Sequence, residues 1–197
     1  MLRPHYIPPS LFVEGLFCSR RLWLKAHHVE IFDEVQTLAM ARTLKQHITG
    51  IRMDDTGWIY EARLPSGTRL DAWVPEEKLA IEFKSGSPHP THVYQAWAIR
   101  QELEQLGVQD AEVHLWYAGA FEKEAETLAQ AYKLDHDWIT DDLYAVCADT
   151  EDPDFGLRME RGAAILLAET TQEAIPETKA SASPTCASCA YFPFCHS

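Results

Sequence analysis

The stretch GWIYEARLPSGTRLDAWVPEEKLAIEFKSG, residues 57–86, decides the fold of this chain. It divides into three short runs rich in apolar and aromatic residues: Trp58–Leu64, Thr68–Val74 and Lys78–Lys84. The two spacers between them consist of Pro, Ser, Gly and Glu, which is typical of tight turns between consecutive strands. We therefore predict three antiparallel strands that form a meander.

Helical patterns and one further strand surround this meander. Residues 1–16 read as a lead-in segment, because Pro8, Pro9 and Gly15 are turn signals. Apolar spacing predicts helices over 17–27, 34–48, 92–106, 122–133 and 157–169, and a strand over 111–118. The order helix, three strands, helix, strand predicts an α/β or α+β domain whose sheet is flanked by helices.

The C-terminal part of the chain changes composition twice. Residues 170–185, TTQEAIPETKASASPT, are polar and rich in Thr, Ser, Ala and Pro, as linkers are. Residues 186–197, CASCAYFPFCHS, are instead dense in cysteine and aromatic residues. We expect a domain over 1–169, a linker over 170–185 and a small separate segment over 186–197.

Composition and charge limit the classes of protein. Of the 197 residues, 46% are apolar and 11% aromatic, which is enough for a packed core. No run of about 18 apolar residues is present, and early prolines interrupt any signal-like stretch, so we expect a cytoplasmic protein without membrane spans. The net charge of −13 disfavours a broad phosphate-binding surface. A nucleic-acid enzyme of this charge would concentrate its carboxylates away from the active face or rely on a basic partner.

A carboxylate–lysine pattern lies within the predicted meander. Asp71 is followed after ten residues by Glu82-Phe83-Lys84. Because side chains alternate along a strand, Glu82 and Lys84 share one face and Phe83 faces the other, and a hairpin brings Asp71 alongside. Two carboxylates beside an amine suit a Mg²⁺ or Mn²⁺ site that hydrolyses phosphodiesters. The same residues also fit an alternately charged surface strand.

Two residues outside the meander are candidates to join this group. His47, at the end of the predicted helix 34–48, is a candidate further metal ligand, although a histidine at a helix C-terminus is also favoured by the helix dipole. Gln95, one turn into the helix that follows, could contact a metal-bound water, a carboxylate or a phosphate. It fits a solvated helix glutamine equally well.

The cysteines form a second pattern. Cys186, Cys189 and Cys195 lie within ten residues, and Cys18, which precedes Arg20 and Arg21, is the natural fourth ligand. Disulfides are rare in the cytosol, so four such thiolates indicate zinc or an iron–sulfur cluster. The aromatic packing of AYFPFC favours the cluster and does not exclude zinc. Cys147 stands apart, and we expect it to be a buried structural thiol.

Taken together, these motifs resemble the fourth family of CRISPR-associated proteins, Cas-four. The resemblance spans Cys18 to Cys195, and it rests on the order and spacing of the motifs. It implies a restriction-endonuclease-like (RecB-like) nuclease core with a central mixed sheet, and a C-terminal iron–sulfur segment. The family pattern places a tyrosine four residues after the helix glutamine, where this chain has Ile99.

The resemblance also implies roles for individual residues. His47, Asp71, Glu82 and the Phe83 carbonyl would bind Mg²⁺ or Mn²⁺, Lys84 would be the catalytic lysine, and Gln95 would act beside it. The iron–sulfur cluster, usually 4Fe-4S, would be held by Cys18, Cys186, Cys189 and Cys195. Family members trim the single-stranded overhangs of prespacer DNA beside the protospacer-adjacent motif, together with the Cas-one integrase and its partner Cas-two. Some are fused to the integrase, so the chain is expected to be either a whole protein or one part of a fusion.

Two other hypotheses remain from the sequence. One is an iron–sulfur exonuclease of recombination or repair, although such domains normally lie in longer chains and no helicase Walker motif is present here. The other is a non-enzymatic acidic adaptor that uses a metal-stapled tail to bind a basic partner, which the charge of −13 favours.

Overall fold

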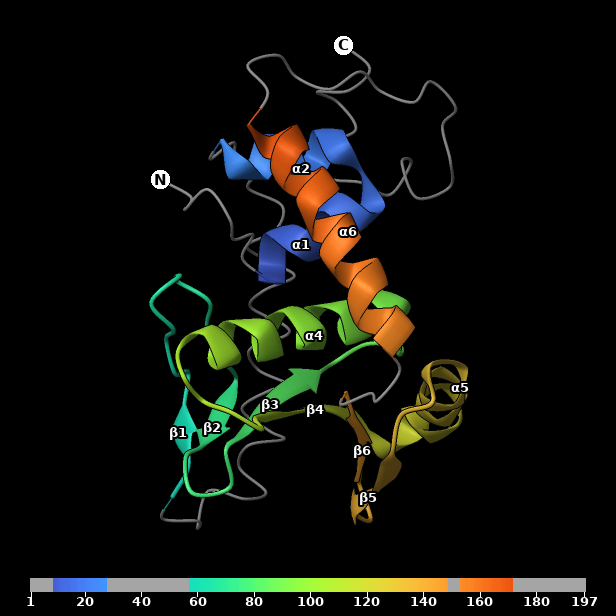
Figure 1. Ribbon diagram of the computed structural model, residues 1–197. Coiled ribbons are helices and arrows are strands. Elements are labelled where there is room, and N and C mark those ends of the chain that lie inside the picture. Colours follow the sequence, from blue (N-terminus) through green and yellow to red (C-terminus); the bar gives the residue numbers. More distant parts are fainter. Residues whose placement is uncertain (1–8, 28–56, 149–152, 172–197) are drawn as a thin grey trace.

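The structure, a computed structural model, describes residues 9–27, 57–148 and 153–171 (Figure 1). These residues form a mixed six-stranded sheet in the order β1-β2-β3-β4-β6-β5, with helices packed against it. The prediction of a mixed α/β domain whose sheet is flanked by helices is thus confirmed. No helix within the described ranges is both long enough and apolar enough to cross a membrane.

The predicted meander is confirmed, with shorter strands than the sequence pattern indicated. Strands β1 (Ile59–Tyr60), β2 (Ala72–Val74) and β3 (Leu79–Lys84) pair antiparallel in chain order. Regular pairing stops after β1 because Glu61 has a positive φ of 55°, although an isolated bridge joins Arg63 to Arg69 beyond it. Local backbone geometry, rather than side-chain pattern, sets the lengths of the first two strands.

A helical crossover then makes the sheet mixed. Helix α4 (Pro90–Gln105) follows β3 and leads to β4 (Glu112–Ala118), which pairs parallel to β3 over six residue pairs. Two residues favour the start of α4. The side chain of His89 caps the helix and accepts a hydrogen bond from the Thr91 backbone N–H, and Pro90 occupies the first helical position, where a proline is tolerated. The predicted helix 92–106 and strand 111–118 are therefore present.

A hairpin after β4 was not predicted. The predicted helix 122–133 is present as α5 (Glu122–Tyr132), which a 3-10 turn, η1 (Gly119–Phe121), precedes. The chain then forms β5 (His136–Thr140) and β6 (Leu143–Cys147), and β6 inserts antiparallel between β4 and β5. The run that becomes β6 has five residues, which is too short for its periodicity to identify it.

The N-terminal segment corrects one prediction. Residues 9–17 form helix α1 (Pro9–Phe17) rather than a lead-in, and α2 (Ser19–Ala26) follows directly. Pro9 is the first residue of α1, where a proline is tolerated, and a Cβ on Gly15 would lie 2.5 Å from a methyl group of Leu166. Both residues were interpreted as turn signals, whereas one begins a helix and the other permits close helix packing.

The last described helix is α6 (Pro153–Thr170), which contains the predicted helix 157–169 and extends to the start of the predicted linker. The predicted helix 34–48, nearly all of the linker and the segment 186–197 lie outside the described residues.

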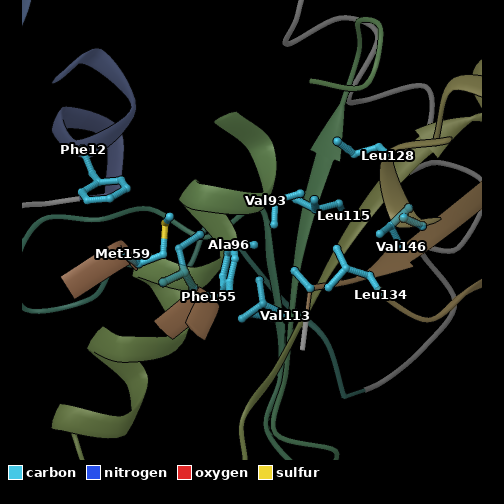
Figure 2. Packing of buried hydrophobic residues seen from close by; sticks show 14 of the residues in the cluster. Phe12, Val93, Ala96, Val113, Leu115, Leu128, Leu134, Val146, Phe155 and Met159 are labelled. Atoms are coloured by element: carbon cyan, nitrogen blue, oxygen red, sulfur yellow. The ribbon is translucent and has the colours of Figure 1, made fainter. Parts of the chain in front are cut away.

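The main core lies between the sheet and its helices. Helices α4 and α5 cover one face of the sheet, and α1, α2 and α6 pack beyond α4 (Figure 1). Figure 2 shows side chains from α1, α4, α5, α6, β4 and β6 meeting in one cluster: Phe12, Val93, Ala96, Val113, Leu115, Leu128, Leu134, Val146, Phe155 and Met159. A second apolar cluster lies on the opposite face of the sheet around Ile81 and Trp116.

Candidate active site

The β2–β3 hairpin brings Asp71 beside Glu82, as its predicted geometry requires. Ala72 pairs with Ile81, so the next positions along the two strands are Asp71 and Glu82. The Phe83 backbone N–H donates to Asp71 Oδ2 at 2.8 Å, and the Asp71 N–H donates to Glu82 Oε1 at 3.4 Å. These two cross-strand contacts hold both carboxylates at the end of the hairpin.

Side-chain alternation along β3 separates polar from apolar groups as predicted. Glu82 and Lys84 contact helix α4, while Phe83 points to the opposite face and packs edge-to-face on Trp116, with ring centroids 5.7 Å apart. Glu82 retains only 3% of its exposure, so β3 is not a solvated surface strand at this point. The interpretation as an alternately charged surface strand is therefore wrong for these residues.

Gln95 closes the group from helix α4. Its Oε1 accepts a hydrogen bond from Lys84 Nζ at 2.8 Å, and its Nε2 donates to Glu82 Oε2 at 3.0 Å. Lys84 Nζ also donates to Glu82 Oε2, at 3.3 Å. The sequence left a metal-bound water, a carboxylate or a phosphate as contacts of Gln95, and the structure shows a contact with the Glu82 carboxylate. The amide oxygen can only accept, so it bonds to the lysine, and the amide nitrogen can only donate, so it bonds to the glutamate. Gln95 therefore favours one arrangement of Lys84 and Glu82.

The electrostatics of this group are dominated by burial. The pKa of Glu82 is raised from 4.5 to about 7: desolvation is the largest cause, the charge of Lys84 opposes it, and the nearby charge of Asp71 adds to it. A single ammonium group therefore does not fully offset the burial of this carboxylate beside a second one. A site of this kind attracts additional positive charge, such as a divalent cation.

Sequence reasoning missed two neighbours of Lys84. Tyr117 pairs with Lys84 across the β3–β4 register, and its hydroxyl lies 3.1 Å from Nδ1 of His92 on helix α4. Burial, Lys84 and His89 together lower the pKa of His92 from 6.5 to about 3, so its imidazole is neutral at physiological pH. The sequence could have indicated His92, because it lies three residues before Gln95 and so shares one side of the helix with it.

Ile99 stands where the pattern of the family that the motifs resemble has a tyrosine. It lies one turn beyond Gln95 on α4, is fully buried, and belongs to the main core. The Ile99 side chain therefore stabilises the packing of α4 on the sheet. Trp97 and Tyr94, on the same helix, are partly buried and pack against the same cluster.

The predicted cluster ligands are only partly described. Cys18 is a half-buried free thiol at the junction of α1 and α2, while Cys186, Cys189, Cys195 and the candidate metal ligand His47 lie outside the described residues. Arg21 and Lys25, on the helix after Cys18, both form ion pairs with the buried Glu14. The positive charge of Arg21 is therefore engaged by a carboxylate.

Cys147 is half-buried rather than fully buried. Burial, followed by the charges of Glu112 and Asp135, raises the pKa of its thiol from 9.0 to about 11. The thiol is therefore protonated at neutral pH and lacks the activation that a nucleophilic cysteine needs.

Comparison with known proteins adds no relative: no protein-family model matches the chain, and neither the curated proteins nor the solved structures contain a match.

Proposed function

We propose that this chain is a divalent-metal-dependent deoxyribonuclease with a restriction-endonuclease-like core. The observation that carries the proposal is the convergence of Asp71, Glu82 and Lys84 on one side of the sheet, with Gln95 joining the last two. The order of a helix, a three-stranded meander, a helix and a parallel strand supports it, because it positions this group at the end of the meander and under the following helix.

The donor set fits Mg²⁺ or Mn²⁺. Both ions prefer carboxylate and carbonyl oxygen ligands. Glu82 is a buried carboxylate whose pKa is raised by desolvation that Lys84 does not fully offset. Asp71, Glu82 and the carbonyl of Phe83 would hold the ion, and His47 would complete the set. When bound, the ion supplies a water of lowered pKa and neutralises charge on the phosphate.

The other residues of the group act on the nucleophile and on charge. The Lys84 ammonium orients the attacking water and stabilises the negative charge that develops on the phosphate oxygens. Gln95 holds Lys84 against Glu82, which keeps the amine within reach of that charge. His92 and Tyr117, joined by a hydrogen bond, line the site beside Lys84 with neutral groups, so they do not compete with it for the phosphate.

The substrate and partners follow from the resemblance to the Cas-four family. The DNA would be the single-stranded overhang of a prespacer, trimmed at the protospacer-adjacent motif during CRISPR adaptation in the cytoplasm. The Cas-one integrase and Cas-two would be the protein partners. The net charge of −13 supports a division of labour in which a basic partner supplies most of the affinity for DNA.

An iron–sulfur cluster held by Cys18, Cys186, Cys189 and Cys195 is part of the same proposal. The position of Cys18, a half-buried free thiol between two helices that pack under α6, is compatible with such a ligand. A cluster with ligands from both ends of the chain would tie residues 186–197 to the domain, so its loss would lower stability.

The test compares Lys84→Ala with the wild type on end-labelled single-stranded and overhang DNA in the presence of Mn²⁺. Lys78→Ala is the matched control, because Lys78 is an exposed lysine just before β3 that bonds to the Gln109 carbonyl. We expect Lys84→Ala to lose about 100-fold or more of the cleavage rate, and Lys78→Ala to retain it. Equal cleavage by all three proteins would refute the assignment of Lys84 and of this site. No cleavage by the wild type, even with its partners present, would refute the nuclease and favour the adaptor.

A further inference from the structure

A second group of metal-binding side chains lies on the opposite face of the sheet from Glu82 and Lys84. Glu112 and His114 project from β4, and Cys147 ends the neighbouring strand β6. His114 pairs directly with Cys147 in the antiparallel register, so their side chains lie on the same face. One ligand atom from each of the three residues lies within 4.8 Å of the other two.

We propose that Glu112, His114 and Cys147 form a binding site for a zinc-class divalent metal, separate from the proposed nuclease site. Thiolate, imidazole and carboxylate are the three side-chain ligands that Zn²⁺ uses in proteins. The Cys147 thiol would release its proton to the solvent when the metal binds. With Zn–S bonds of about 2.3 Å and Zn–N and Zn–O bonds of about 2.0–2.2 Å, tetrahedral donors lie about 3.4–3.7 Å apart. The three donor atoms lie within 4.8 Å of one another, and His114 Nε2 is 3.1 Å from Glu112 Oε2.

The backbone around this group is held firmly. Strand β4 is paired on both sides, with β3 and with β6. The Cys147 N–H donates to the Asp135 carbonyl, and the Ala148 N–H donates to the Val113 carbonyl, both at 2.8 Å. The strand pairing therefore fixes the backbone positions of His114 and Cys147, and Glu112 is already in contact with His114.

Burial and charge suit a cation that enters from solvent. Glu112 is exposed, whereas His114 and Cys147 are half-buried, so the group is open on the Glu112 side. The carboxylates of Glu112 and Asp135 both act electrostatically on the Cys147 thiol, which makes the surroundings negative. Three protein ligands leave a fourth position for water, as in zinc sites that exchange ligands.

The group is distinct from the cysteines proposed to hold the cluster. None of Cys18, Cys186, Cys189 or Cys195 belongs to it, and it contains no residue of the proposed nuclease site. Zinc and the nuclease metal ions also differ in preference, because thiolate and imidazole select Zn²⁺ over Mg²⁺. Zinc bound here can therefore be measured apart from nuclease activity.

The test is a Zn²⁺ titration of the cluster-loaded full chain against a chromophoric chelator, with Co²⁺ as a spectroscopic substitute. Cys147→Ser and His114→Gln each should bind one zinc equivalent fewer than the wild type, and the thiolate-to-Co²⁺ band should disappear in Cys147→Ser. Glu112→Gln, an exposed change that preserves the fold, should weaken zinc binding at least 10-fold. The proposed cluster cysteines are the same in all of these proteins, so they contribute equally to each count.

Two controls separate this proposal from the preceding one. His27→Gln, which removes an exposed histidine on the far side of the domain, should keep the wild-type zinc count. Lys84→Ala should also keep it, whatever its effect on cleavage. The proposal is overturned if Glu112→Gln, His114→Gln and Cys147→Ser bind Zn²⁺ with the stoichiometry and affinity of the wild type, or if the wild type shows no thiolate-to-Co²⁺ band that Cys147→Ser removes.

Discussion

Replacing Glu82 with glutamine should stabilise the metal-free protein, although it removes an ion-pair partner of Lys84. Glu82 has a folded-state pKa of about 7 and an ordinary value of 4.5, so the folded state binds its proton more tightly than the unfolded state does. This stabilisation is complete below pH 4.5 and is lost as the pH rises through 7. Relative to the fully protonated carboxyl group, the stabilisation that has been lost is about 3 kcal/mol at pH 8, about 2 kcal/mol at pH 6, and less than about 1 kcal/mol at pH 5.

Glutamine keeps the shape of the protonated carboxyl group and does not ionise, so the variant avoids this loss. The pKa of about 7 already includes the attraction between Glu82 and Lys84, so this attraction does not make the variant less stable than the wild type. For a chain of this size, about 3 kcal/mol corresponds to a rise in Tm of about 6–12 °C. We expect that rise at pH 8 in the absence of divalent ions and almost none at pH 5.

The assay is thermal unfolding of the wild type and Glu82→Gln, prepared with equal cluster content, at pH 5, 6 and 8 with EDTA or with Mn²⁺. Mn²⁺ should raise the Tm of the wild type at pH 8 by mass action and leave the variant unchanged. Equal Tm values for the two proteins at all three pH values in EDTA would refute the reasoning. So would a variant that is less stable than the wild type at pH 8.

Three further changes test the packing, the positioning and the cluster. Gln95→Leu should lower the cleavage rate at least 10-fold with Tm lowered by a few degrees, because Lys84 and Glu82 each lose a hydrogen-bond partner; an unchanged rate would remove Gln95 from the mechanism. Ile99→Ala should cost about 2–5 kcal/mol in the free energy of unfolding, measured by denaturant titration, because Ile99 is fully buried; a cost below about 1 kcal/mol would contradict its place in the core. Anaerobically purified protein should be brown and absorb near ~400 nm, and Cys186→Ser should lose that absorbance; a colourless wild type would contradict the cluster.

Side-chain alternation is the part of the site that the sequence predicts well. On a strand the direction of one side chain determines that of the next, so the pattern Glu82-Phe83-Lys84 suffices to assign Phe83 to one face and its two neighbours to the other. The turn residues between the strands made the antiparallel pairing equally clear. Asp71 followed from these two facts without any knowledge of the remaining chain.

Residues that depend on non-local pairing were missed. Tyr117 lies beside Lys84 because β3 and β4 run parallel in a particular register, which no local pattern specifies. The group Glu112, His114 and Cys147 requires β6, and that strand was not identified from its five residues. Pro9 and Gly15 were misassigned because each fits both a turn and a helix, and only the packing of α1 against α6 decides between the two.

The central claim is that Asp71 and Glu82 share one divalent ion beside Lys84. Electron paramagnetic resonance of free Mn²⁺ in titrations of the wild type, Asp71→Asn and Lys84→Ala tests it most directly. The account predicts that Asp71→Asn binds one Mn²⁺ fewer than the wild type, whereas Lys84→Ala binds the same number and fails to cleave DNA. Wild-type Mn²⁺ binding by Asp71→Asn would contradict the account.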